Sequence, residues 1–212
     1  MKIAIKTERL ILSPLNQQDS FSFVKIAQSM RQEKIENPDY FLYSRFDNNA
    51  VKNEEDLIDA VDKLLKSAND IKPGETSLRL KIALKNGEVI GYIGYLYTPE
   101  NEIQSDFGIF LDPHYEHQGY AFEAEKALLA HFFVNCDEKI YLTIHPKNIP
   151  SYYLNQKCGA IKISYEKESK YGSERDALVI TRKAFIKTVW DKEFLSGKKE
   201  EKFLIEYLEQ YN

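Results

Sequence analysis

The feature that most constrains the fold is a strict alternation of apolar and mostly charged side chains, followed by a tight-turn dipeptide. Apolar Leu78, Leu80, Ile82 and Leu84 alternate with Arg79, Lys81, Ala83 and Lys85. Asn86-Gly87 follows, and an apolar stretch resumes from Val89 to Tyr97. A period of two is typical of strands, and Asn-Gly favours the two-residue turn that joins antiparallel strands. The sequence therefore predicts a β-hairpin over residues 78–97.

The rest of the chain mixes strand and helix patterns. We expect strands at 10–14, 103–111, 140–144, 161–165 and 177–181, and helices at 19–27, 53–68, 121–132 and 150–157. Residues 30–49 are tyrosine-rich and have no regular period, so we expect them to be irregular. The central order β-β-β-α-β-α-β-β predicts an α/β (α+β) fold with a mixed, mostly antiparallel sheet flanked by helices.

The chain beyond residue 185 has a helical character of its own. We expect a domain at 1–185 and a C-terminal helical extension at 186–212, with Gly197 as a break and 197–202 as a solvated hinge. The second part carries an apolar stripe at helical spacing: Phe203, Leu204, Tyr207, Leu208 and Tyr211. This stripe could pack on its own domain, bind a partner or form a homodimer.

The bulk composition excludes several classes of protein. A net charge of −4 without a basic stripe gives no reason to expect nucleic-acid binding. The two cysteines, Cys136 and Cys158, and the four histidines lack the short spacing of a zinc site, so we expect no metal. No apolar run approaches the roughly 18 residues of a membrane span, and we expect a soluble, cytoplasmic monomer or homodimer.

A candidate anion site lies where the predicted strand 103–111 leads through a turn into the next helix. The first turn of a helix has backbone N–H groups without helical partners, and the helix dipole adds partial positive charge there. Gly119 and Ala121 are small enough to let phosphate oxygens approach those N–H groups. The junction is therefore a candidate pyrophosphate site.

The stretch Gly119-Tyr120-Ala121-Phe122-Glu123-Ala124 resembles the acetyl-CoA motif of the GNAT (general N-acetyltransferase) superfamily. It is most similar to the RimJ/RimL-like branch, which acetylates ribosomal-protein N-termini. Glu116 stands where the family usually has Gln or Arg, and a carboxylate there is unfavourable for a pyrophosphate unless it points away.

Two further stretches carry the same resemblance in the expected order. Asn148-Ile149-Pro150-Ser151 and the later Lys157-Cys158-Gly159 match the family's Asn-x-x-Ser followed by a helix that ends in Lys-x-Gly. Thr7-Glu8-Arg9-Leu10-Ile11-Leu12 resembles the opening of this branch. The resemblance covers about residues 7–185.

The resemblance implies a GNAT fold and an acyl-CoA-dependent N-acetyltransferase. The amine of a protein N-terminus or a small molecule would attack acetyl-CoA directly in a ternary complex. The implied cofactor-binding residues are Leu111, Gln118, Gly119, Tyr120, Ala121, Asn148 and Ser151. The alternative is a non-catalytic acyl-CoA-binding or protein-interaction module with the same fold.

Candidate catalytic residues follow from the same comparison. Asp106 falls on the family's acidic position in the strand before the turn and is the candidate base, with Glu102 and His145 in reserve. Many relatives have a tyrosine acid at the position of Asn155, and an amide is no useful proton donor. Ser151 is then the candidate acid.

Several site assignments keep an alternative. Tyr152 or Tyr153 could replace Ser151 as the acid, Ser151 could simply cap its helix, and the thiolate could take its proton from water. Glu123, in the first turn of the helix, is expected to be structural. The acceptor groove is expected at 30–50 and 77–97.

Overall fold

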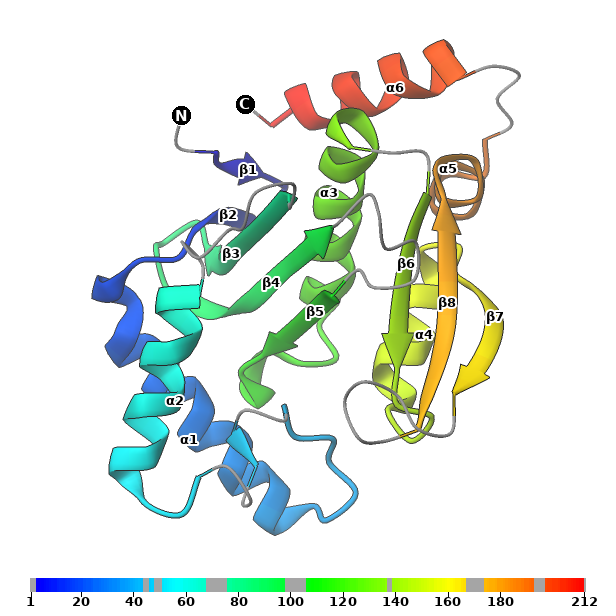
Figure 1. Cartoon of the computed structure of the whole chain (residues 1–212). Coiled ribbons are helices and arrows are strands. Elements are labelled where there is room, and N and C mark those ends of the chain that lie inside the picture. The colour runs from blue at the N-terminus through cyan, green and yellow to red at the C-terminus, as the bar shows by residue number, and fades with distance from the viewer. Residues whose placement is uncertain are drawn as a thin grey trace.

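The computed structural model describes residues 3–43, 46–47, 51–67, 76–97, 106–136, 139–166, 174–192 and 197–211. Figure 1 shows the chain as sheets that diverge beside a long central helix, α3. In chain order the elements are β1 (Ile5–Lys6), β2 (Leu10–Pro14), η1 (Gln17–Asp19), α1 (Ser20–Glu36), α2 (Glu54–Ser67), β3 (Thr76–Leu84), β4 (Val89–Tyr97), β5 (Asp106–Leu111), η3 (Pro113–Tyr115), α3 (Tyr120–Asn135), β6 (Lys139–Ile144), α4 (Ile149–Lys157), β7 (Ile161–Glu166), β8 (Arg175–Thr181), α5 (Arg182–Trp190) and α6 (Gly197–Glu209).

The strands form two sheets. The larger has the order β1-β2-β3-β4-β5, the smaller has the order β6-β8-β7, and the pairings in both are antiparallel. The predicted hairpin is confirmed as β3 and β4, with Gly87 at φ 92° in the turn. Strands β5 and β6 lie close together but belong to different sheets, and Figure 1 shows them diverging along their length. The central sheet is therefore open between β5 and β6.

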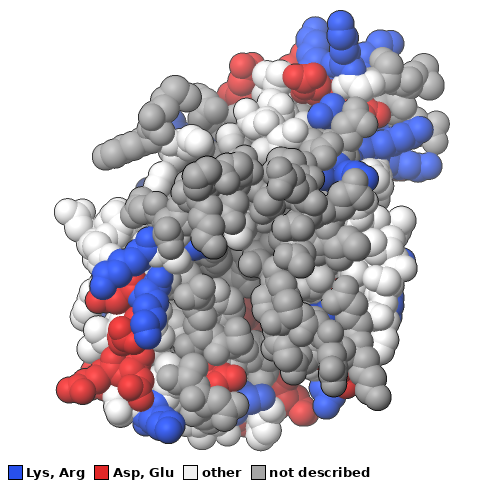
Figure 2. All heavy atoms as spheres, viewed as in Figure 1, with Lys and Arg blue, Asp and Glu red and all other residues white. Residues whose placement is uncertain are grey.

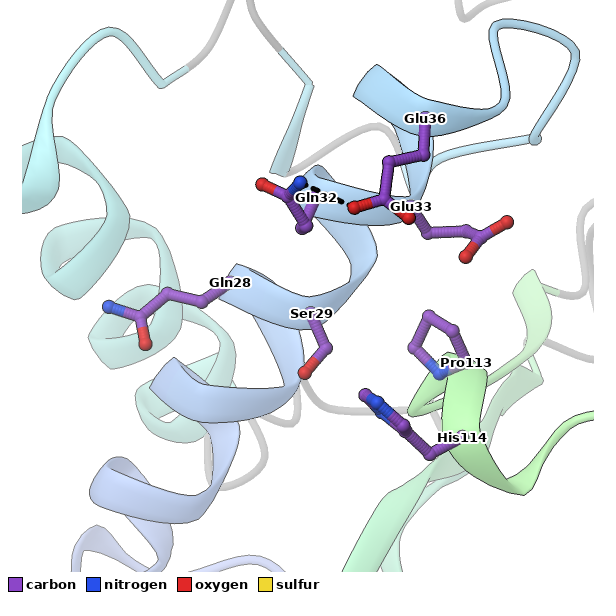
Figure 3. A pocket seen from close by; sticks show the side chains of 7 residues that line it. All are labelled: Gln28, Ser29, Gln32, Glu33, Glu36, Pro113 and His114. Carbon is purple, nitrogen blue, oxygen red and sulfur yellow. Dashed lines mark hydrogen bonds between the residues drawn. The ribbon is translucent and has the colours of Figure 1, made fainter.

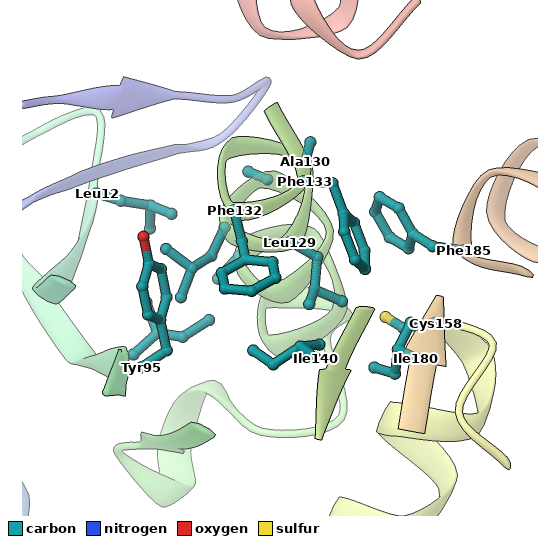
Figure 4. Packing of buried hydrophobic residues seen from close by; sticks show 14 of the residues in the cluster. Leu12, Tyr95, Leu129, Ala130, Phe132, Phe133, Ile140, Cys158, Ile180 and Phe185 are labelled. Carbon is teal, nitrogen blue, oxygen red and sulfur yellow. The ribbon is translucent and has the colours of Figure 1, made fainter. Parts of the chain in front are cut away.

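The two faces of the larger sheet carry separate apolar clusters. Because successive strand residues point to opposite faces, Tyr92 packs with α1 and α2, whereas Ile93 packs with α3. Figure 4 shows α3 at the centre of the second cluster, where its side chains meet those of both sheets and of α5. Helix α3 therefore packs against both sheets, on either side of the opening between β5 and β6.

Two local expectations were wrong. Residues 30–36 are not irregular but form the last two turns of α1, which ends at Glu36 with Asn37 as its C-cap. The residue before a proline disfavours helix, and Pro38 places the end at this point. Gly197 is the first residue of α6 rather than a break, so 197–202 is the start of a helix and not a hinge. The preceding helix, α5, ends at Trp190, and its C-cap Asp191 has φ 51°.

The C-terminal extension packs on its own domain. Helix α6 crosses over the upper end of α3 in Figure 1 and buries Leu204 and Tyr207 in the same cluster as the sheet residues. The ring centroids of Trp190 and Tyr207 are 5.0 Å apart, which ties α5 to α6. The expected division after residue 185 falls inside α5. The structure thus chooses the intramolecular alternative for much of the apolar stripe.

Candidate acetyl-CoA site between β5 and β6

The start of α3 has the geometry of an anion site. Gly119 is the N-cap residue at φ 84°, a left-handed conformation that favours glycine. The first helical bond at this end runs from the Glu123 N–H to the Gly119 carbonyl at 3.0 Å, so the N–H groups of 120–122 precede the helical ladder. The Gln118 side chain turns back and donates to the His114 carbonyl at 2.8 Å. Backbone groups, not the Gln118 amide, therefore face the candidate site.

Glu123 anchors the N-terminal segment to this helix. Its Oε1 accepts from the Thr7 hydroxyl at 2.6 Å and from the Arg9 N–H at 2.8 Å. Its Oε2 accepts from Arg9 Nε, also at 2.6 Å. Burial acts to raise the pKa of Glu123, but these hydrogen bonds outweigh it and the net pKa is lowered. The expected structural role of Glu123 is confirmed.

Leu111 ends β5 at the edge of the opening. It lies opposite Gly91 in β4, and the next N–H, that of Asp112, donates to the Ile90 carbonyl at 2.8 Å. Successive N–H groups along a strand point to opposite edges. The Leu111 N–H therefore points away from β4, toward the side where β6 lies.

The start of α4 differs from the expectation in one respect. The N-cap is Asn148, whose Oδ1 accepts from the Ser151 N–H at 3.2 Å, so Ser151 is not the cap. Asn148 precedes the helix after a turn closed by its own N–H bond to the His145 carbonyl, which leaves its side chain to cap. Asn155 is buried and donates to the Ser151 carbonyl at 2.9 Å. Asn148 and Ser151 thus lie together at the start of α4.

The other candidates for acid and base are now placed. Tyr153 is 64% exposed. The pKa of the Tyr152 hydroxyl is raised by burial and by the Asp176 carboxylate. Asp106 is the first residue of β5. His145 follows β6, and its ring lies 5.5 Å from that of Phe41. Glu102 lies outside the described residues.

Glu116 is occupied by a residue of the segment after α1. Its Oε1 accepts a 2.8 Å hydrogen bond from the Tyr40 hydroxyl. Burial raises the pKa of Glu116, while the hydrogen bond from Tyr40 acts to lower it. Tyr40 and Phe41 therefore contact the β5 side and the β6 side of the opening, at Glu116 and His145 respectively. The Glu116 carboxylate is therefore directed at a partner within the protein, which is the arrangement in which a carboxylate at this position is compatible with a nearby pyrophosphate.

A surface hollow of about 510 Å³ lies between α1 and η3 (Figure 3). Figure 3 shows Glu33 and Glu36 on α1 facing the same space as Pro113 and His114 of η3. The pKa of His114 is raised by its hydrogen bond to Asp112. Most of the side chains that line the hollow are polar. Among them, Glu33 also acts to raise the pKa of Tyr40 and of Glu116.

Charged side chains gather at separate places on the face seen in Figure 2. Red spheres lie at the lower left, where α2 begins with Glu54, Glu55 and Asp56, and blue spheres lie over the lysines of α6.

Within the described ranges, no group of three or more His, Cys, Asp or Glu side chains is arranged to hold a metal ion. None of the helices in the described part is both long and apolar enough to cross a membrane.

Arg9 is not among the residues predicted for the site, and Tyr40 is expected in the acceptor groove but not as a partner of Glu116. The motif Thr7-Glu8-Arg9 marks the N-terminal segment. No local pattern, however, indicates that Arg9 contacts Glu123, which is 114 positions away in the sequence. Tyr40 falls in the stretch expected to line the acceptor groove, yet its contact with Glu116 spans 76 positions. Correlated substitutions between such positions are the signal that could have found them.

Comparison with known proteins agrees with this geometry. The acetyltransferase (GNAT) domain model matches residues 9–161. YnaD of Bacillus subtilis (strain 168), described as an uncharacterized N-acetyltransferase, is 32% identical over 88 residues, which are 41% of this chain and 51% of that protein. The chain thus spans about half the length of this curated relative.

Solved structures share the fold at low identity. Mycobacterium smegmatis RimJ in complex with a CoA disulfide has a TM-score of 0.63 at 16% identity, covering 94% of this chain and 91% of that one. The spermidine N-acetyltransferase of Vibrio cholerae in complex with CoA and spermine has a TM-score of 0.59 at 16% identity, covering 85% and 99%. With the family model matching well over half of its residues, this chain belongs to the GNAT acetyltransferase family.

Proposed function

We propose that the protein transfers the acetyl group of acetyl-CoA directly to a primary amine within a ternary complex. The observation that carries this proposal is the helix start at Gly119, placed at the end of a strand, β5, that has separated from β6. The backbone N–H groups of 120–122 would bind the pyrophosphate, and the pantetheine arm would lie in the opening. Asn148 and Ser151 would border the arm on the α4 side.

The chemistry assigns one task to each candidate. The neutral amine attacks the thioester carbon, and the Leu111 N–H stabilises the oxyanion that forms. Asp106 accepts the proton that the amine loses, either directly or through water. The C–S bond then breaks, and the departing thiolate takes a proton from Ser151 or from water, because the Asn155 amide cannot supply one.

The class of acceptor is the finer part of the proposal. Two proteins of similar fold, RimL, a ribosomal L7/L12 α-N-protein acetyltransferase, and the spermidine N-acetyltransferase named above, suggest a protein N-terminus and a small amine as the acceptors to test. Glu33 and Glu36 beside the hollow, together with Glu116, favour a positively charged acceptor. We propose a protein N-terminus or a small amine, in the cytoplasm, where both free cysteines would stay reduced.

The first test is calorimetric titration of the purified protein with acetyl-CoA. Ala121→Glu puts a carboxylate into the first turn of α3 without the backbone strain that any side chain meets at Gly119. Ala60→Glu is the matched control, because it adds the same group at a half-buried position of α2. Thermal unfolding of both variants checks that they are folded.

The expected result is saturable binding by the wild type and Ala60→Glu, and a loss of binding in Ala121→Glu. Peptide N-termini and then spermidine would next be offered as acceptors while free thiol is followed. An absence of acetyl-CoA binding by the wild type would exclude the proposed activity. Binding without turnover of any amine would favour the non-catalytic module.

A further inference from the structure

The guanidinium of Arg9 is fixed at the candidate phosphate site from several sides. Its Nε donates to Glu123 Oε2 at 2.6 Å, and its Nη1 donates to the Gln118 carbonyl at 3.0 Å. Its Cζ lies over the Tyr120 ring, 4.3 Å from the ring centroid. Three residues around the start of α3, Gln118, Tyr120 and Glu123, thus hold the Arg9 side chain, which comes from the segment just before β2.

These contacts use only part of the guanidinium. Arginine has five N–H donors, and the two hydrogen bonds to Glu123 and Gln118 occupy two of them. The Arg9 side chain is 42% exposed. Its Nη2 lies 3.4 Å from the point where a Cβ on Gly119 would stand. The remaining donors are therefore next to the glycine that opens the helix.

This placement complements the helix start. A guanidinium can donate two parallel hydrogen bonds to one phosphate, and a pre-positioned side chain loses little entropy on binding. Glu123 neutralises part of the charge of Arg9, so its role in this arrangement is to fix the orientation of the guanidinium. The guanidinium therefore lies beside the helix start at which the N–H groups of 120–122 precede the helical ladder.

We propose that Arg9 is a phosphate-binding residue of the acetyl-CoA site, donating hydrogen bonds to the pyrophosphate beside the N-terminus of α3. The proposal rests on the proposed function, since it names a further ligand contact in the same site. It makes the N-terminal segment part of the cofactor site, although the segment lies outside the turn-and-helix motif. Arg9 acts in binding and takes no part in the chemical step.

The test compares acetyl-CoA with S-acetylpantetheine, which has the same thioester arm without phosphates. Both are titrated calorimetrically into wild type, Arg9→Ala, Arg9→Lys and Thr7→Val, and acetyl-CoA is also titrated at several NaCl concentrations. Thr7→Val is the matched control, because it removes a hydrogen bond to the same Glu123 carboxylate but no cation. Arg9→Lys keeps the charge and serves if Arg9→Ala is poorly folded.

We expect Arg9→Ala to weaken acetyl-CoA binding by about tenfold or more, as for the loss of a charged hydrogen-bond donor to phosphate. Arg9→Lys should lose less, and Thr7→Val should stay within about twofold of the wild type, a range that loss of one neutral anchor contact allows. The affinity for S-acetylpantetheine should not change. The dependence of the acetyl-CoA affinity on NaCl should become shallower in Arg9→Ala.

Other outcomes overturn the proposal. An equal loss for both ligands in Arg9→Ala would show that Arg9 only maintains the structure. The same NaCl dependence in wild type and Arg9→Ala would show that no phosphate contact is lost. A wild type that binds S-acetylpantetheine as tightly as acetyl-CoA would also contradict it, while the proposed function would stand. If the wild type binds neither, the proposed function fails first.

Discussion

The hydroxyl of Tyr40 donates a 2.8 Å hydrogen bond to Glu116, which joins the segment after α1 to the turn that leads into α3. The next residue, Phe41, packs against His145 at the end of β6. One short segment therefore contacts both sides of the opening between β5 and β6. Its position depends on a contact with the turn that precedes the candidate cofactor site.

Tyr40→Phe should lower the free energy of unfolding by about 1–2 kcal/mol, the range for a hydrogen bond from a neutral donor to a partly buried carboxylate. The loss of the donor should also raise the pKa of Glu116 further. Urea denaturation at neutral pH measures the first effect. Tyr165→Phe removes a hydrogen bond to Glu174 at an exposed site and should have a smaller effect. Equal losses of unfolding free energy in the two variants would show that the Tyr40–Glu116 hydrogen bond stabilises the protein no more than an exposed one.

Glu125 gives the stability of the protein a pH dependence. The residue is fully buried on α3, and burial raises its pKa from the ordinary 4.5 to about 8, while the Cys158 thiol offsets part of the rise. The folded state therefore holds this proton more tightly than the unfolded state. Its stabilising effect is complete below pH 4.5 and is lost as the pH rises to about 8.

Glu125→Gln should remove this dependence, because the amide stays neutral at every pH. Between pH 6 and pH 8 the wild type should lose roughly 1.4 kcal/mol per pH unit relative to the variant. Urea unfolding at pH 6, 7, 8 and 9 measures the difference. Glu206→Gln, on the exposed side of α6, should run parallel to the wild type. A constant difference between wild type and Glu125→Gln would contradict the raised pKa.

Gly159→Ala should be strongly destabilising because two costs combine. Gly159 has φ 88°, and a Cβ there would lie 2.9 Å from the backbone carbonyl group of Ala184. Gly87 has φ 92° with nothing within 4 Å of such a Cβ, so Gly87→Ala isolates the backbone cost of about 1 kcal/mol. Chemical denaturation should show Gly159→Ala losing at least about 2 kcal/mol more. Similar losses would mean that the contact between α4 and α5 relaxes freely.

Asp106→Asn should lower kcat by about 10²–10⁴ if the residue is the general base, with little change in the affinity for acetyl-CoA. Steady-state rates with the acceptor identified by screening, measured from pH 6 to 9, provide the comparison. Asp59→Asn is the control, since Asp59 pairs with Lys63 on the exposed side of α2. An unchanged rate in Asp106→Asn would move the role of base to Glu102, to His145 or to solvent.

Much of the fold follows from signals that act within a few residues. The alternation around Asn86-Gly87 and the helix start at Gly119 are both present as predicted, because a strand period, a turn dipeptide and a helix cap express local backbone preferences. Asn53 likewise caps α2 by accepting from the Asp56 N–H. The order of elements and the place of the candidate cofactor site were therefore determined by the sequence itself.

The tertiary structure decided which distant residues meet. The apolar stripe on α6 predicts that another surface covers it. Only the tertiary structure shows that this surface belongs to its own domain, where α6 packs on α3. Arg9 reaches Glu123 and Tyr40 reaches Glu116 across 114 and 76 positions, where no local preference acts. The separation of β5 from β6 is likewise a property of the assembled sheets, since α3 must pack against both before the opening between them exists.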